Sequence, residues 1–114
     1  MNHQITIKNR LWIVRNDHTF LGEGRVELLQ TIDQLGSITK AAKKMQMSYL
    51  KAWKLVQSMN MSSQKPLVIR LSGGKGGGGT TLTEQGYKAI NLYRDICQKN
   101  LEVTQHFKQR LLEF

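Results

Sequence analysis

The sequence predicts a mainly α fold with small β-hairpins, and three observations support this. Apolar residues recur at helical spacing in three consecutive segments between residues 25 and 60. A glycine-rich stretch then separates two short extended runs within residues 67–82, and a last apolar stripe continues over residues 84–112. An N-terminal hairpin over residues 5–21, a three-helix core, a wing and a long C-terminal helix together indicate a winged helix-turn-helix.

Length and charge limit the class of protein. The chain has 114 residues, which suits one domain over residues 1–114 with one hydrophobic core. It carries 17 lysines and arginines against 8 acidic residues, a formal charge of +9. Such a charge attracts polyanions and opposes self-association, so it favours nucleic acid as a partner. An anionic membrane or an acidic protein would satisfy the same balance.

Cysteine and histidine usage indicates a reduced protein without a metal or other cofactor. Cys97 is the single cysteine, and His3, His18 and His106 do not cluster with it at metal-ligand spacing. The N-terminus lacks the apolar run of a signal peptide, and no run of about 18 apolar residues could span a bilayer. We therefore expect a cytoplasmic protein that makes no use of a membrane.

The N-terminal segment has the composition of a β-hairpin. β-branched and aromatic residues dominate from Ile5 to Val14, Asn16-Asp17-His18 supplies turn chemistry, and residues 19–21 can return antiparallel. Gly22 and Gly24 are expected to end the hairpin.

Three helices should follow in close succession. The first is predicted over residues 25–35, with Gly36 as its left-handed stop, and Ser37 can cap the second, short helix. Gln46 and Met47 leave a turn of about three residues before Ser48 caps the third helix, which should end near Asn60. The buried face of the third helix is predicted to be Ala52, Val56 and Met59. Trp53 lies beside this apolar stripe, where a tryptophan is more often a core residue than one that stacks on bases or sugars.

The third helix has a basic side that suits contact with DNA. An ordinary amphipathic helix with solvated lysines is the alternative. In a helix-turn-helix the N-terminal part of this helix enters the major groove, whereas neighbouring side chains hold the backbone. The candidate DNA-binding residues are Ser48, Tyr49, Lys51, Lys54 and Gln57 on this helix, Ser37, Thr39 and Lys40 before it, and Lys75 and Gly76 in the wing.

The glycine-rich tip of the wing resembles a nucleotide-binding motif only superficially. Gly74, Gly76 and Gly79 fit GxGxxG, but this stretch neither opens a helix nor lies in a βαβ unit. Strands are expected at residues 67–71 and 80–82 instead. The tip is either a flexible hairpin end or a wing that presents backbone amides and Lys75 to phosphates.

The last helix is longer than a small domain needs. Thr83 can cap it, and its apolar stripe continues to residue 112, a length of about 45 Å. The apolar residues of its second half would be exposed unless another chain covers them. We expect a homodimer with Tyr93, Cys97, Leu101, Phe107 and Leu111 at the interface. A helix that folds back or frays is the alternative.

No catalytic constellation is visible. The acidic residues are scattered over the first third and the last helix, and none pairs with a histidine or a nucleophile. Cys97 lies on the apolar stripe, where a cysteine is usually a small packing residue. We do not expect an enzyme.

Two stretches, GSITKAAKKMQMSYLKAWKLVQSMN and PLVIRLSGGKGGGGTTLTEQG, closely resemble the N-terminal DNA-binding domain of ModE-type molybdate-responsive transcriptional regulators. The resemblance covers roughly residues 12–93, and a LysR-like winged helix is more distantly similar. It implies a winged helix-turn-helix that dimerises through its long last helix and binds a near-palindromic operator in double-stranded DNA.

The resemblance does not extend to molybdate sensing. Full-length members of the ModE type carry C-terminal molybdate-binding domains, and the sequence ends at Phe114 without one. A stand-alone member, a separate ligand-sensing protein as partner, and a truncated chain are the alternatives.

The function expected is thus a homodimeric transcriptional regulator that lacks the molybdate-binding domain. A protein-interaction module with a winged-helix fold and no specific DNA binding is the first alternative. A direct oxyanion sensor, with molybdate or tungstate held by the glycine-rich loop, is the second.

Overall fold

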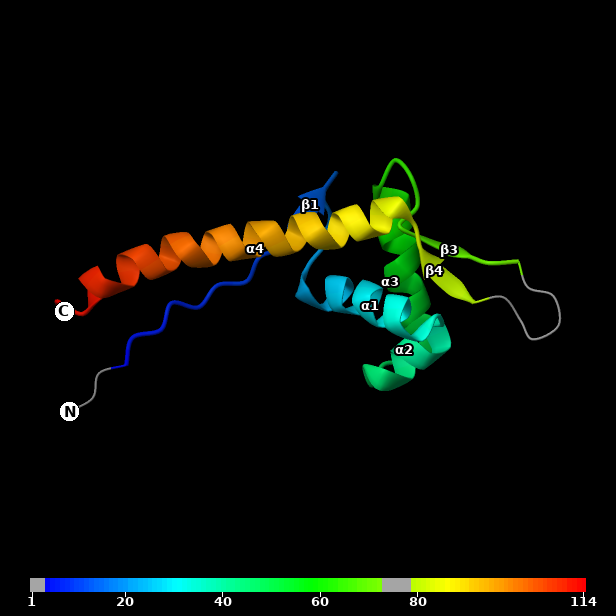
Figure 1. The fold of residues 1–114 in the computed structure, drawn as a ribbon, viewed down its shortest axis with the longest axis horizontal. Coiled ribbons are helices and arrows are strands. Elements are labelled where there is room, and N and C mark those ends of the chain that lie inside the picture. Colours follow the sequence, from blue (N-terminus) through cyan, green and yellow to red (C-terminus); the bar gives the residue numbers. More distant parts are fainter. Residues whose placement is uncertain (1–3, 73–78) are drawn as a thin grey trace.

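The computed structural model describes residues 4–72 and 79–114 of the chain. Four helices and two small antiparallel hairpins follow one another in the predicted order, which confirms the winged helix-turn-helix fold (Figure 1). The elements are β1 Ile13–Arg15, β2 His18–Leu21, α1 Glu23–Leu35, α2 Ile38–Lys44, α3 Tyr49–Ser62, β3 Val68–Arg70, β4 Thr80–Leu82 and α4 Glu84–Leu111.

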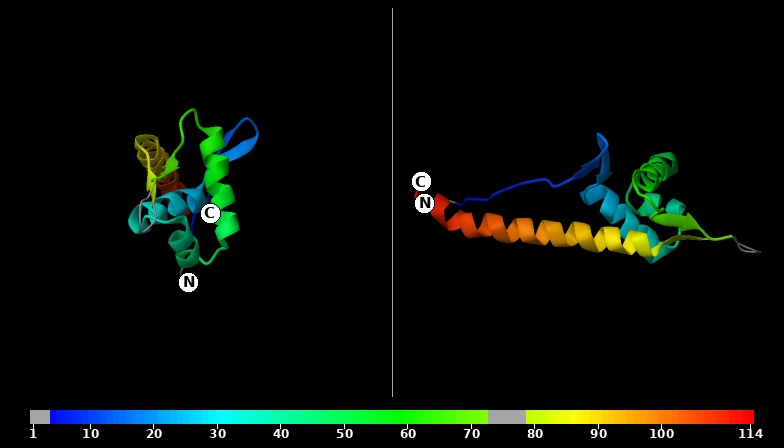
Figure 2. Two further views of the ribbon diagram at one scale, coloured as in Figure 1. Left: turned by 90° about the vertical axis from the view of Figure 1, so that its right-hand side faces the viewer. Right: turned by 90° about the horizontal axis from the view of Figure 1, so that it is seen from above.

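Helix α1 packs against the first half of α4, and α2 and α3 pack against α1 and against each other. The second half of α4 extends away from this cluster (Figures 1 and 2). The β3–β4 hairpin projects from the opposite end of the molecule. The helical cluster and the second half of α4, here called the free half, therefore lie at different ends of the molecule.

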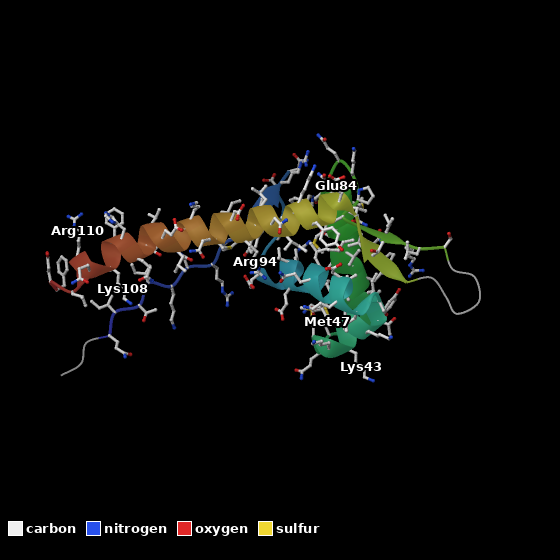
Figure 3. The ribbon with its side chains drawn as sticks, viewed as in Figure 1. Lys43, Met47, Glu84, Arg94, Lys108 and Arg110 are labelled. Atoms are coloured by element: carbon white, nitrogen blue, oxygen red, sulfur yellow. The ribbon has the colours of Figure 1, made fainter. Side chains whose placement is uncertain are left out.

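The core lies where α1, α3 and the start of α4 meet. Its buried residues are Leu21, Val26, Leu28, Leu29, Ile32, Ile38, Ala41, Ala42, Ala52, Val56, Met59, Leu67, Val68, Leu82, Ala89, Ile90 and Tyr93. Arg94 of α4 adds a polar link to α1, because its guanidinium donates to both carboxylate oxygens of Glu23 at 2.9 Å and to Gln30 Oε1 at 2.8 Å. This link joins α4 to α1, and Figure 3 shows Arg94 on the side of α4 that faces α1.

Helix α1 begins earlier than expected. It starts at Glu23 rather than Arg25, so Gly24 lies in the first turn and only Gly22 precedes the helix, as its N-cap. The helix stops where predicted: Gly36 has φ 67° and its N–H donates to Ile32 O at 2.7 Å. A glycine takes this left-handed conformation without the Cβ penalty of other residues.

Helix α3 runs to Ser62, past the predicted end at Asn60. The side chain of Asn60 serves the neighbouring strand instead of ending the helix. Its Nδ2 donates to Val68 O at 3.0 Å, and its Oδ1 accepts from Leu67 N at 2.8 Å and Val68 N at 3.2 Å. Asn60 thereby fastens β3 to α3.

The N-terminal hairpin is shorter than predicted. Its turn is as expected, with left-handed Asn16 (φ 51°) and Asp17 (φ 63°), but β1 begins only at Ile13. Residues 4–12 form no strand; they lie towards the same end of the molecule as the second half of α4, with the chain running in the opposite direction (Figure 1). The Tyr93 hydroxyl donates to Leu11 O at 2.7 Å, so this segment is tied to the helix rather than to a second strand.

Thr83 caps α4 as predicted and also joins it to the wing. Its Oγ1 accepts from Gly86 N at 3.1 Å, and its hydroxyl donates to Pro66 O at 2.7 Å. Among the described residues, no helix is both long and apolar enough to cross a bilayer.

Candidate nucleic-acid interface

The turn between α2 and α3 sets the angle between these two helices. Ser37 caps α2 by accepting from Lys40 N at 3.1 Å, and Ser48 caps α3 by accepting from Lys51 N at 3.0 Å. Between them, Gln46 takes a left-handed conformation (φ 58°), and Met47 N donates to Ala42 O at 3.0 Å. Two capped helices joined by this turn form the helix-turn-helix that the sequence predicts.

Helix α3 buries one face and exposes another. Ala52, Val56 and Met59 are buried, as predicted, and hold α3 against the rest of the core. Tyr49, Lys51 and Lys54 are exposed, and Gln57 is half-buried. The exposed side chains of the first two turns can therefore reach a partner without disturbing the core.

Trp53 is only partly a core residue. It keeps 38% of its surface exposed, whereas the sequence pattern placed it in the core. Its position beside the buried stripe, rather than on it, explains the difference. Arg25 of α1 also contacts α3, because its Nη1 donates to Ser58 Oγ at 3.0 Å. Burial lowers the pKa of Arg25 below its ordinary value.

The wing lies directly beside the start of α2. Strands β3 and β4 pair antiparallel with Val68 opposite Leu82 and Arg70 opposite Thr80. Thr80 N donates to Gly36 O at 3.0 Å, which ties β4 to the turn before α2. A Cβ on Gly79 would lie 2.8 Å from Gly36 O, so only glycine allows this close approach.

Arg70 connects the wing to the third helix. Its Nη2 donates to the Tyr49 hydroxyl at 2.9 Å. The two side chains line a polar hollow of about 360 Å³, here called the wing hollow, with Gly36, Ser37, Ile38, Thr39, Leu71, Gly79 and Thr80. A cation and several hydroxyl groups facing one opening suit an anionic oxygen such as that of a phosphate.

A second hollow lies along α3 and is mostly apolar with a basic edge. We call it the α3 hollow; it has a volume of about 510 Å³ and is lined by Arg25, Ser48, Leu50, Lys51, Lys54, Leu55 and Ser58. The predicted residues Ser48, Lys51 and Lys54 thus meet in one place. Lys40 is exposed on α2. Lys75 and Gly76 lie outside the described residues.

Three residues of this surface were missed by the sequence reasoning. Arg70 could have been noticed as a lone cation in the otherwise apolar run LVIRL, but its partner Tyr49 is 21 positions away. Arg25 is brought in from α1, and Leu50 was passed over because an exposed leucine has no polar group to mark it. Spatial proximity, rather than spacing along the chain, assembles the site.

The free half of α4 carries most of the residues expected at a dimer interface. Leu101, Phe107 and Leu111 are exposed by 49%, 47% and 37%, and Cys97 is half-buried against the core. Tyr93 is only 1% exposed and lies inside the monomer, so it is not available to a partner. Lys108 and Arg110 flank the apolar residues near the end of the helix (Figure 3). In the described part of the chain, no three potential ligands among His, Cys, Asp and Glu come together as a metal site would require.

A helix-turn-helix with a β-hairpin packed beside the start of its first helix defines the winged helix-turn-helix class of regulators. The bacterial regulatory helix-turn-helix model of the lysR family matches residues 24–87. The chain therefore belongs to the lysR family of bacterial regulatory helix-turn-helix proteins.

Curated relatives carry the name ModE. The chain is 38% identical over 95 residues to the molybdenum transport protein ModE of Azotobacter vinelandii, covering 83% of this chain and 35% of the relative. It is 42% identical over 90 residues to the transcriptional regulator ModE of Haemophilus influenzae, covering 79% and 35%. The DNA-binding transcriptional dual regulator ModE of Escherichia coli is 43% identical over 79 residues, covering 69% and 30%. The chain thus spans about a third of the length of these relatives.

Solved structures agree on the fold. ArgP from Mycobacterium tuberculosis superimposes with a TM-score of 0.53 at 17% identity, covering 75% of this chain and 30% of that one. VV2_1132, a LysR family transcriptional regulator, superimposes with a TM-score of 0.55 at 20% identity, covering 80% of this chain and 30% of that one.

Proposed function

We propose that this chain is a DNA-binding transcriptional regulator that binds operator DNA as a homodimer. The observation that carries the proposal is that the start of α2, the first turns of α3 and the base of the wing line two hollows that present hydroxyl groups and cations. The lysR-family match and the ModE relatives support it. The proposal places the protein in the cytoplasm, where such DNA is.

The first two turns of α3 would enter the major groove. Lys51 and Lys54 are exposed there and are free of acidic partners among the described residues. Lysine can donate to the O6 and N7 acceptors of guanine or bind a phosphate. The Arg70–Tyr49 pair would hold the DNA backbone at the wing hollow, because a guanidinium already engaged by a phenol keeps further donors for a phosphate oxygen.

The free half of α4 would form the dimer contact. An apolar stripe on a helix that extends beyond its own core favours a second copy, since burial removes Leu101, Phe107 and Leu111 from water. A two-fold pair of recognition helices would then face two half-sites about 34–36 Å apart or a multiple of this.

Salt dependence tests the DNA contact. If six to ten phosphates are neutralised per dimer, on the order expected for this class, the logarithm of the affinity falls with the logarithm of the salt concentration at a slope of roughly −5 to −9. Fluorescence anisotropy with a random duplex, and then with the promoter of its own operon, measures this slope. A slope near zero contradicts the proposal and favours a protein-interaction module. A lack of binding to both the random duplex and the promoter does the same.

The role of Lys54 is tested by its alanine variant. Lys54→Ala should weaken binding to the promoter by about tenfold or more and binding to the random duplex much less, if Lys54 contacts a base. Lys88→Ala is the matched control, because Lys88 is an exposed lysine of α4 paired with Glu84 at 3.7 Å. If Lys54→Ala and Lys88→Ala weaken binding to the promoter equally, Lys54 contributes only its charge and does not contact a base.

The dimer is tested by a charge placed on the apolar stripe. Phe107→Asp should shift the protein from dimer to monomer in sedimentation at micromolar concentration, because an aspartate buried between two helices lacks a partner. Gln105→Asp introduces the same charge at an exposed polar position of α4 and should leave the dimer intact. A strictly monomeric wild-type chain would refute this part of the proposal.

Molybdate binding is not part of the proposal. The match to ModE relatives covers about a third of their length and is confined to the helix-turn-helix portion and its flanks.

A further inference from the structure

An exposed apolar side chain, Leu50, lies in the first turn of α3, the part of the helix that would face the bases of DNA. Leu50 is 56% exposed, and it is the second residue of the helix. Scattered exposed leucines are common and need no explanation by themselves. The position of Leu50, rather than its exposure, is what carries the inference.

Leu50 lies on the outward face of α3, opposite the core. Lys54 and Gln57 follow it at spacings of four and three, so the three side chains form one stripe along the helix. Leu50 and Leu55 both line the α3 hollow, together with the cations Arg25, Lys51 and Lys54. A hollow lined by both leucines and cations suits a polyanion that also presents an apolar group.

The major groove of DNA offers one apolar group on the base edges, the C5-methyl group of thymine. We infer that Leu50 is a specificity-determining residue that contacts this methyl group. The inference rests on the proposed function. Leucine has no donor or acceptor, so against any other base edge it would cover polar atoms without pairing them. Leu50 therefore favours thymine by attraction to the methyl group and disfavours cytosine by desolvation, while the flanking lysines remain for guanine or phosphate.

Uracil in place of thymine isolates this contact, because deoxyuridine lacks only the methyl group. The full chain is first used to select binding sites from random-sequence duplexes. Each thymine of one selected half-site is then replaced singly by deoxyuridine, and affinity is measured by anisotropy. Loss of one buried methyl group should weaken binding of the wild-type chain by about fourfold at the position that Leu50 contacts.

The variant Leu50→Ala should bind the thymine and uracil duplexes equally at that position, and weaker than the wild type binds thymine. The substitution is at an exposed helical site, so folding is preserved, and circular dichroism checks this. Met61→Ala is the matched control: Met61 is 84% exposed on the same helix but eleven positions, or about 16 Å, further along. It should retain the fourfold preference for thymine.

The outcomes separate the two proposals. A pool without any enriched sequence overturns the proposed function, and the role of Leu50 with it. An enriched site at which uracil costs nothing at any thymine, or at which Leu50→Ala keeps the full preference, overturns only the role of Leu50. Loss of the preference in Leu50→Ala but not in Met61→Ala supports it.

Discussion

Replacing Asn60 with alanine should detach the wing from the third helix. The Asn60 amide pairs with two backbone N–H groups and one carbonyl of residues 67 and 68 at 2.8–3.2 Å. Leu67 and Val68 are exposed by only 0% and 4%, so water cannot replace the lost partners without opening the structure. The variant leaves all three backbone groups unpaired.

The expected cost follows from these contacts. Each buried polar group left without a partner costs about 1–3 kcal/mol. The gain in helix propensity from asparagine to alanine returns about 0.5–0.7 kcal/mol. We therefore expect Asn60→Ala to lower the free energy of unfolding by about 3 kcal/mol, which is a large part of the stability of a small domain. The melting temperature should fall by about 10 °C or more.

Urea unfolding at one fixed chain concentration measures this loss, since dimerisation makes stability depend on concentration. Asn91→Ala is the control, because Asn91 is an exposed asparagine inside α4 and gains the same helix propensity. If the two variants differ by less than about 1 kcal/mol, the Asn60 bonds do not hold the wing and the reasoning fails.

Two further predictions concern the start and middle of α4. Gly86→Ala should destabilise the fold by about 1–3 kcal/mol although alanine favours helices, because the added Cβ would collide with Leu67 O. Gly24→Ala has open space around its Cβ and should be neutral or stabilising, and thermal melts of the two variants test this difference. Burial raises the pKa of Tyr93 to about 12, with a smaller contribution from Cys97. Since the unfolded chain ionises near 10, stability on the order of 2–3 kcal/mol is present below pH 10 and lost as the pH rises towards 12. Tyr93→Phe should lose this alkaline dependence, and an unchanged pH profile would contradict the assignment.

Local chemistry made much of the fold predictable. Gly36 stops α1 because its left-handed conformation suits glycine, and Ser37, Ser48 and Thr83 cap helices because their hydroxyls accept backbone N–H bonds. These effects act within three or four residues, so they can be recognised in the sequence without knowledge of distant contacts.

Element ends that depend on tertiary contacts were predicted less well. Asn60 was expected to end α3 by its own backbone preference, but its side chain pairs with β3 and the helix continues. Residues 5–12 have strand composition yet form no strand: β2 pairs only with Ile13–Arg15, and Leu11 O accepts instead from the Tyr93 hydroxyl of α4. Tyr93 shares the apolar stripe of α4 with Leu101, and only packing decided that the first is core and the second exposed.

The sequence by itself determined the order of the helices, the turn between α2 and α3, and the basic side of the third helix, because each depends on residues close together in the chain. Tertiary structure alone decided which side chains share a surface. It joined Arg70 of the wing to Tyr49, and it placed Leu50 among cations from α1 and α3. Such contacts depend on how separate elements pack, and no spacing along one element encodes them.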